Sequence, residues 1–248
     1  INKEANKTAG KRPVVVGFGP AGIAAAYSLC LMGYAPIVIE RGNSVDERLV
    51  NVRDFWDSGK LNCESNVQFG EGGAGAFSDG KLNTGNKDKD GIQTAILKTL
   101  IKFGAPKNVL YDSKPHIGTD LLTGIVKNIR KKIVSMGGDV RFNTQFIEPI
   151  FDNRGVKKKV CGCFVKYNGK IEEIDTDCIF LAIGHSARDT FLSVNKAGLY
   201  MEPKPFAVGY RLIHEQKYIN FTQYGEGYEK KGLPAASYKL TYTAKSGR

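Results

Sequence analysis

The feature that most constrains this chain is a glycine-rich turn between a strand-like run and a helix-like run close to its start. The apolar residues Val14–Val16 predict a short buried strand, and the sequence continues Gly17-Phe18-Gly19-Pro20-Ala21-Gly22. The first glycine of this pattern permits a tight turn, the second leaves room for a pyrophosphate beside the backbone, and the third allows close helix–strand packing. The first amides and the dipole of the following helix favour a negative charge. The pattern therefore predicts a dinucleotide-binding βαβ unit.

The residues that follow complete this unit. An apolar helix is expected over 23–32, Gly33 can end it, and a second strand over 35–39 leads to Glu40. Glu40 follows Gly17 by 40 − 17 = 23 positions, close to the spacing of a carboxylate that accepts hydrogen bonds from a ribose. A glycine-rich turn of some other α/β protein is the alternative interpretation. The candidate cofactor-binding residues of this unit are Gly17, Gly19, Pro20, Ala21, Gly22 and Glu40.

A membrane-spanning helix is a second alternative, because no charged residue occurs from Pro13 to Ile39 and such a run is long enough to cross a bilayer. Pro20, Pro36 and several glycines divide the run into strand-sized and helix-sized pieces, which excludes this reading. The polar, basic residues 1–12 lack the apolar core of a secretory signal. We expect them to be a leader or a linker, and we expect a cytoplasmic protein that makes no membrane contact.

Composition narrows the function classes. The chain has 248 residues with 42% hydrophobic residues, enough for one large domain or two intertwined ones. Its net charge is +11, but the basic residues are scattered and lack interleaved aromatics, which argues against nucleic acid as a partner. Five cysteines, an odd number, indicate a reducing compartment without a disulfide framework. Cys161 and Cys163 lack the spacing of a redox pair.

The middle of the chain reads as helices. Ser44 and Glu47 form a capping-box pattern before a helix with apolar residues at helical spacing, on which we expect Trp56 to be a packing residue. A second helix is expected over 92–103. The longest runs over 119–136, with Thr119 as its N-cap and Gly137-Gly138 as its stop.

Strands follow these helices. Residues 140–144 predict one strand, which 145–151 either continue or follow with another. Residues 160–167 and 170–174 predict a hairpin around Asn168-Gly169. Residues 177–184 predict a buried strand that ends at Gly184, where the backbone can pass close to a cofactor. We expect an α/β fold: a Rossmann-like domain with a parallel sheet that begins with βαβ, and an inserted β-rich second domain. A meander that leads into such a strand points to FAD rather than NAD.

A glycine-rich segment over 66–82 carries the third signal. Its glycines free backbone amides to point at an anion or at a flavin ring, while Ser78 and Lys81 add a hydroxyl group and a positive charge. A flexible surface loop is the alternative.

With these motifs in place, the chain resembles the uncharacterised FAD-dependent (NAD(FAD)-utilising) dehydrogenases, which are related to the glutathione-reductase-type two-dinucleotide-fold flavoproteins. The matching segments cover most of the chain from Pro13 onward. They are residues 16–22, Glu40-Arg41-Gly42, 69–82, Lys114-Pro115-His116-Ile117-Gly118-Thr119-Asp120, 180–189, 205–211 and Leu233-Pro234-Ala235-Ala236-Ser237-Tyr238-Lys239-Leu240.

The resemblance implies that the pyrophosphate of a non-covalently bound FAD lies on residues 17–22 and its adenosine ribose on Glu40. It places Arg41 near the adenosine end and Phe146 against adenine through its backbone. It also places Gly72, Gly73, Ser78 and Lys81 near the diphosphate or the flavin. Members of the family continue further, so we expect a chain that is truncated at its C-terminus.

The expected domains are a leader or linker over 1–12, an FAD-binding domain formed by 13–90 and 176–198, and an incomplete second (substrate) domain formed by 91–175 and 199–248. The expected function is FAD-dependent oxidoreduction of an unknown small-molecule substrate, with NAD(P)H as a candidate transient electron donor. The alternatives are a tRNA-modifying flavoprotein and a non-enzymatic FAD- or NAD-binding module. The oligomeric state is undetermined.

No residue is assigned to catalysis or to a metal. The three histidines are His116, His185 and His214, and His185 directly follows the glycine of the buried strand. The sequence pairs none of them with a carboxylate, so we interpret them as structural. Arg188 and Arg211 are candidates for holding an anion, although isolated arginines more often form surface ion pairs.

Overall fold

The computed structural model describes residues 10–77, 88–112, 116–152, 154, 158–206, 208–210, 212–238 and 240–243. The chain divides into two compact units, Ile1–Leu199 (unit 1) and Tyr200–Arg248 (unit 2). None of the helices in the described ranges is both long and apolar enough to cross a membrane.

A four-stranded parallel sheet forms the centre of unit 1, as the sequence predicts. Its strand order is β3-β2-β1-β7, and the strands are β1 (Val14–Val16), β2 (Ile37–Ile39), β3 (Asp139–Arg141) and β7 (Ile179–Leu181). Helix α1 (Pro20–Leu31) connects β1 to β2, which gives the predicted βαβ unit. Val15 lies between Val38 of β2 and Phe180 of β7 in the register. The glycine-rich turn therefore follows β1, an inner strand of this sheet.

Both faces of this sheet are covered. Val15 and Val38 face one core cluster, which contains helical side chains. Val14, Val16, Ile37 and Ile39 face a second cluster, which contains residues of the antiparallel strands. A parallel strand buried on both faces reads as a continuous apolar run rather than as an alternating one. This explains why the strands are Val-Val-Val and Ile-Val-Ile.

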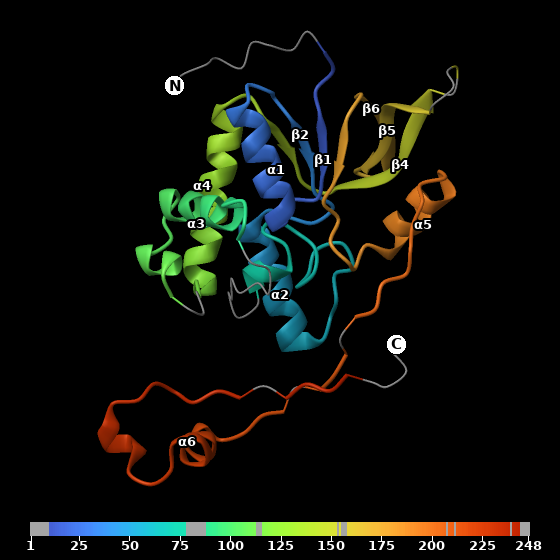
Figure 1. Ribbon diagram of the computed structural model, residues 1–248. Helices are drawn as coiled ribbons and strands as arrows, with labels where there is room; N and C mark the ends of the chain where they lie inside the picture. Colours follow the sequence, from blue (N-terminus) through green and yellow to red (C-terminus); the bar gives the residue numbers. More distant parts are fainter. Residues whose placement is uncertain are drawn as a thin grey trace. The chain divides into compact units, whose positions relative to one another are not determined.

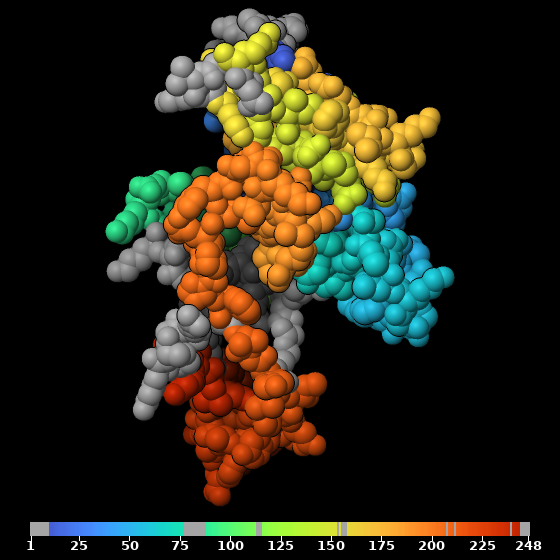
Figure 2. All heavy atoms as spheres, turned by 90° about the vertical axis from the view of Figure 1, so that its right-hand side faces the viewer, coloured from blue at the N-terminus to red at the C-terminus, as the bar shows by residue number. Residues whose placement is uncertain are grey.

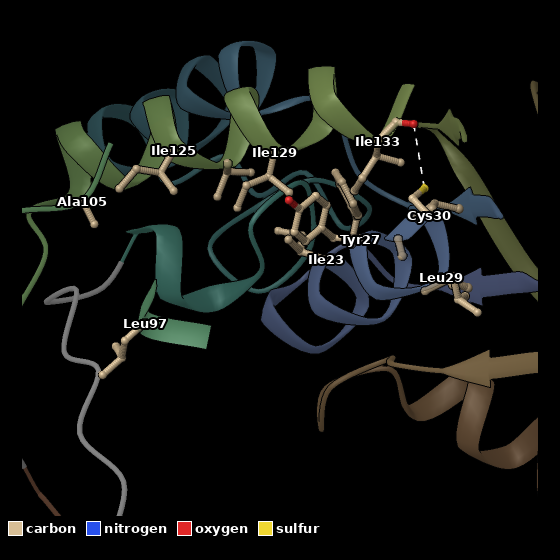
Figure 3. Close-up of a cluster of buried hydrophobic side chains, with 14 of the residues drawn as sticks. Ile23, Tyr27, Leu29, Cys30, Leu97, Ala105, Ile125, Ile129 and Ile133 are labelled. Carbon is tan, nitrogen blue, oxygen red and sulfur yellow. Dashed lines mark hydrogen bonds between the residues drawn. The ribbon is translucent and has the colours of Figure 1, made fainter. Parts of the chain in front are cut away.

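Helices cover the first face (Figure 1). They are α1, α3 (Ile92–Lys102) and α4 (Thr119–Ser135). Side chains of α1 and α4 point toward one another, and the Cys30 thiol lies 3.9 Å from the Ile133 carbonyl oxygen (Figure 3). The apolar spacing of the α4 sequence therefore marks the face that packs on α1.

The second face is covered by a three-stranded antiparallel sheet with the order β4-β5-β6. Its strands are β4 (Thr144–Asp152), β5 (Lys159–Tyr167) and β6 (Lys170–Asp175). Asn168 and Gly169 both have positive φ, 48° and 79°, as a two-residue hairpin turn requires. Figure 2 shows residues 144–152 and 158–175 in yellow to light orange, with α5 (Arg188–Lys196) beside them. The expected β-rich layer is confirmed.

Two strand expectations are corrected. The strand expected over 140–144 ends at Arg141, because Asn143 has a φ of +52° and the chain leaves the parallel sheet there. Residues from Thr144 onward join the antiparallel sheet instead. The strand expected over 177–184 is shorter and is not fully buried. Phe180 and Leu181 are 38% and 41% exposed, because β7 is an edge strand of the described sheet.

Helix ends and one packing residue also differ. Helix α2 runs over Val45–Ser58, and its N-cap Ser44 contacts the Glu47 carboxylate rather than a backbone amide. The N-cap of α4 is Gly118, one residue before the expected Thr119. Trp56 is 66% exposed, so the expectation that it packs is wrong.

Segment 139–141, which the sequence analysis assigned to the second domain, pairs with β2 in the parallel sheet. The domain boundaries themselves stay a prediction.

Unit 2 contains α6 (Gln216–Tyr224) and the short 3-10 helix η3 (Tyr228–Lys231). Of its described residues only Ala236 is buried, and the Ala236 amide donates to Asn220 Oδ1 at 2.8 Å. Its large apolar side chains are exposed, among them Phe206, Val208, Tyr210, Ile213, Leu240 and Tyr242. The described part of unit 2 therefore forms little apolar core of its own.

Candidate dinucleotide-binding site

The turn after β1 has the close packing that its glycines predict. Gly17 has a φ of +97°, and its amide donates to the Ile39 carbonyl at 2.8 Å. A Cβ on Gly17 would lie 2.5 Å from the Ala182 carbonyl oxygen, just beyond β7. A Cβ on Gly22 would lie 2.9 Å from the Gly17 carbonyl carbon and closer still to its oxygen. Glycine is therefore required at both positions by contact with backbone.

The N-terminus of α1 offers a site for an anion. Its N-cap is Gly19 and its first residue is Pro20, and its first turn contains no acidic residue. Within the described ranges, no side chain caps it. The first amides of a helix have no intrahelical acceptor, and the helix dipole favours negative charge there. Ala21 and Gly22 lie in this first turn, and that they contact a pyrophosphate stays a prediction.

Glu40 is nearly buried, with 5% of its surface exposed. Its Oε1 atom accepts the amides of Gly42 and Gly70, both at 2.9 Å, and its Oε2 atom accepts the amide of Phe18 at 2.7 Å. A carboxylate has about four acceptor positions. One position on Oε2 is therefore left, and a ribose hydroxyl group is a donor of the kind that could take it.

The glycine-rich loop lies against the fingerprint turn. The Gly72 amide donates to the Phe18 carbonyl at 2.9 Å. A Cβ on Gly73 would lie 3.0 Å from Gly19 Cα and 3.1 Å from Pro20 Cδ. The structure thus brings together Gly19, Pro20, Gly72 and Gly73, which are more than 50 positions apart in the sequence.

One expectation about this loop is wrong. The amides of Gly70, Glu71, Gly72 and Gly73 donate to Glu40, Asn43, Phe18 and Gly70. They are used within the protein rather than free to face an anion. Residues 70–73 therefore present no row of free donors. That Gly72 and Gly73 approach the diphosphate or flavin stays a prediction.

Sequence reasoning missed Arg48, which is fully buried. Its guanidinium donates to carbonyl oxygens of the glycine-rich loop at 2.7–3.3 Å, those of Asn66, Val67, Gly70, Glu71 and Gly73. One signal was available: Arg48 shares the buried face of α2 with Val45 and Val52 at helical spacing.

Glu71 is a buried charge within the loop itself. Its Oε2 atom accepts the Val45 amide at 2.8 Å, so it caps α2 from a distant part of the chain. Its Oε1 atom lies 3.0 Å from Arg130 Nε, an ion pair whose geometry is not that of a hydrogen bond. Burial raises the pKa of Glu71, although the Val45 amide and Arg130 oppose this.

Arg41 connects three segments. Its guanidinium donates to both carboxylate oxygens of Asp189 at 2.9–3.0 Å and to Glu64 at 2.9 Å, and it lies 4.4 Å from the centre of the Phe69 ring. Burial alone would raise the pKa of Asp189, but the hydrogen bonds and charge of Arg41 lower it. Arg41 thus fixes α5 against the chain that follows β2. Its place near adenosine stays a prediction.

The other candidates are less closely placed. The Phe146 side chain is buried in the core between the sheets, which leaves only its backbone for a ligand. Gly184 has a φ of +66° and open space around it. Ser78 and Lys81 lie outside the described residues. His116, His185 and His214 are all exposed, and His214 belongs to unit 2. In the described ranges, no group of His, Cys, Asp or Glu could hold a metal ion.

Residues 205–248 match the family model described as "FAD-dependent protein, C-terminal domain-like". The chain is 51% identical over 231 residues to a protein of Clostridium beijerinckii (strain ATCC 51743 / NCIMB 8052) that is described only as an uncharacterized protein. This alignment covers 93% of the chain and 42% of the relative. The chain therefore spans less than half the length of the relative it matches.

The fold has counterparts among solved structures. Thermovibrio ammonificans THI4 is similar with a TM-score of 0.50 and 20% identity, over 77% of this chain and 64% of that one. A weaker similarity, with a TM-score of 0.43 and 15% identity over 72% and 47%, is to a 3-ketosteroid-Δ4-(5α)-dehydrogenase from Rhodococcus jostii RHA1. The similarity to THI4 concerns the fold alone, the α/β architecture described above. The matching family model points to FAD as the cofactor.

Proposed function

We propose that this chain provides the FAD-binding part of an FAD-dependent oxidoreductase that acts on a small molecule, with the flavin held non-covalently. One observation carries the proposal. Two glycine turns, at Gly19 and at Gly73, pack against each other at the uncapped N-terminus of α1, beside Glu40. This arrangement offers a helix dipole for a diphosphate and an acceptor for a ribose. The family model matched by residues 205–248 supports FAD in particular.

Each residue then has a stated part. The turn from Gly17 to Gly22 would hold the diphosphate, the remaining acceptor position of Glu40 the ribose, and Gly72 and Gly73 would form the adjoining wall. When bound, FAD supplies redox chemistry at its isoalloxazine ring, and the protein supplies position and electrostatics. Following the resemblance, Arg41, the Phe146 backbone, Ser78, Lys81 and Gly184 would complete the site, and NAD(P)H would be a transient electron donor. We assign no catalytic residue.

The test uses a substitution that the fold tolerates and the ligand does not. A Cβ on Gly19 would make only an ordinary contact, 3.5 Å from Gly73 Cα, and its φ is −79°. Gly19→Ala should therefore lower the melting temperature only slightly, through the poorer N-cap, yet place a methyl group where a pyrophosphate would approach. Gly124→Ala is the control, because Gly124 lies on α4 with open space around it.

The purified protein is scanned for flavin absorption before and after denaturation, and FAD is titrated by fluorescence. We expect non-covalent flavin or its uptake by the wild type, and affinity weaker by at least about tenfold, or ~1.4 kcal/mol, in Gly19→Ala alone. A colourless wild type that takes up no FAD would refute the proposal for this chain. Equal FAD affinity in Gly19→Ala would place the cofactor elsewhere.

One observation favours the alternative of a tRNA-modifying flavoprotein. Lys102, Lys131 and Lys132 line a shallow, open groove on α3 and α4, so part of the positive charge is clustered. A groove that contacts several phosphates would give affinity for RNA that falls steeply with salt. Triple substitution of these lysines by glutamine, followed by tRNA binding at two salt concentrations, separates this alternative from a groove with no RNA role.

A further inference from the structure

We propose that Arg48 is a positioning residue, whose buried guanidinium holds loop 66–73 in the conformation that closes the dinucleotide site. The part of this proposal that concerns FAD rests on the proposed function. The part that concerns the contact between Arg48 and the loop is independent of it, because it involves the protein alone.

The hydrogen bonds show what the guanidinium holds. Nη1 donates to the carbonyl oxygens of Glu71, Gly73 and Gly70 at 2.7, 2.9 and 3.3 Å. Nε donates to Asn66 O at 2.8 Å and Nη2 to Val67 O at 2.9 Å. Hydrogen bonds from a charged donor are roughly twice as strong as neutral ones. A single side chain on α2 thus holds most of the carbonyl groups of the loop.

The loop backbone is shaped around this side chain. Gly70, Gly72 and Gly73 have φ of +121°, +86° and +63°, conformations that L side chains rarely adopt. A Cβ on Gly70 would lie 2.9 Å from Arg48 Nε and nearer still to its Cδ. Gly70 is therefore required by the arginine beneath it, whereas a Cβ on Gly72 would meet Ala76 and a Cβ on Gly73 would meet Gly19 and Pro20.

Arginine is the side chain that this task needs. A guanidinium has five donors in a planar fork, whereas a lysine ammonium has three donors on one nitrogen. Burial lowers the pKa of Arg48 to about 10, with the Glu40 and Glu71 charges opposing the shift, so the group stays charged at neutral pH. Without it, carbonyl groups of the loop would lose these donors, and a buried acceptor left without a partner destabilises the conformation that buries it.

The loop transmits this position to the site. Arg48 is fully buried, so it acts through the loop rather than on a ligand. The held loop in turn donates its Gly72 amide to Phe18 O and places Gly73 against Gly19. A loop that samples other conformations would lower the fraction of protein competent to bind, and the apparent affinity would fall in proportion.

The chain offers a matched control. Arg12 also donates to backbone carbonyl oxygens, those of Ala35, Pro36 and Gly137, at 2.6–3.3 Å. These residues flank the starts of β2 and β3, not the glycine-rich loop. Arg12→Lys should therefore weaken the fold without loosening the loop, while Arg48→Lys should do both.

The experiment compares amide hydrogen exchange and FAD binding in the wild type and the two variants. Without FAD, we expect peptides covering 66–73 to exchange at least about tenfold faster in Arg48→Lys, while peptides of β1 and β2 stay protected. With FAD, we expect the Kd to rise by about tenfold in Arg48→Lys and to stay near the wild-type value in Arg12→Lys. Gly70→Ala displaces the guanidinium without removing it, and should show the same signature if Arg48→Lys does not fold.

The outcomes separate the two ideas. Loop exchange at the wild-type rate in Arg48→Lys and Gly70→Ala, or equal loosening in Arg12→Lys, would overturn the role of Arg48. Faster loop exchange with unchanged FAD affinity would overturn its role in binding alone. A wild type that takes up no FAD would refute the proposed function, while the exchange measurement still decides whether Arg48 holds the loop.

Discussion

Because α1 lies very close to the turn after β1, we predict that Gly22→Ala lowers the stability of the protein. Helix propensity alone would predict the opposite. Alanine is intrinsically more favourable than glycine inside a helix by about 1 kcal/mol, so Gly22→Ala on α1 would ordinarily stabilise. Here the added Cβ would lie 2.9 Å from the Gly17 carbonyl carbon. Carbon atoms in contact lie about 3.5 Å apart or more, so the helix must move by at least about 0.6 Å.

Neither side of this contact can yield cheaply, because the neighbour is backbone and Gly17 is itself fixed by its hydrogen bond to Ile39 and by Ala182. Overpacking of this kind costs roughly 3 kcal/mol, which leaves a net loss of about 2 kcal/mol after the helix preference is subtracted. For a unit of this size that loss lowers the melting temperature by roughly 4–8 °C.

Thermal unfolding followed by circular dichroism checks the prediction, with Gly124→Ala as the matched control. Gly124 lies in helix α4 with open space around its Cα, so only the helix preference applies. We expect its melting temperature to rise by roughly 2–4 °C. Opposite signs for the two variants are the expected result. A Gly22→Ala variant at least as stable as the wild type would show that α1 does not pack against the turn in this way.

Two further predictions concern titratable groups. Burial raises the pKa of the Cys30 and Cys163 thiols to about 11, so a thiol reagent at pH 8 should modify the exposed Cys63 and Cys178 first and these two only after unfolding. Early modification of the buried pair would contradict this. Because the pKa of Glu71 is higher in the folded than in the unfolded protein, folding takes up a proton there. The free energy of unfolding of the wild type, relative to that of Glu71→Gln, should therefore rise as the pH falls from 7 toward 4.5. Urea unfolding at each pH measures this difference, and a flat or opposite trend would disprove the prediction.

The parts of the fold that the sequence predicted are those determined by neighbours along the chain. The turn from Gly17 to Gly22 is specified by three glycines between apolar runs, and Asn168-Gly169 is specified by the positive φ of its hairpin turn. The length of α4 followed from its apolar spacing and its glycine stop. In each case the residues that decide the structure lie within one element or at its end.

The errors have the opposite character, because each depends on contacts distant in sequence. Glycines over 70–73 suggest free amides, but whether an amide is free depends on acceptors such as Asn43 and Phe18. An apolar run at 179–181 suggests burial, but β7 lies at an edge of the described sheet. Arg48 was missed because an arginine on a helix is normally at the surface, and only its position on the apolar face of α2 hinted otherwise.

The stretch from Glu40 to Arg48 contains the carboxylate that is predicted to bind the ribose. The same stretch also holds the glycine-rich loop in place. Gly70 donates its amide to Glu40 and accepts a hydrogen bond at its carbonyl from Arg48. Glu40 directly follows β2, and Arg48 lies on α2, the next helix. This short stretch of chain therefore places a buried negative group and a buried positive group against the same loop residue, Gly70. Each charge is matched by backbone groups of the opposite polarity, amides at Glu40 and carbonyl oxygens at Arg48. Glu40 therefore supports the structure of this site and is also the candidate acceptor for the ribose. We expect a substitution of Glu40 to disturb the loop even when no ribose is bound.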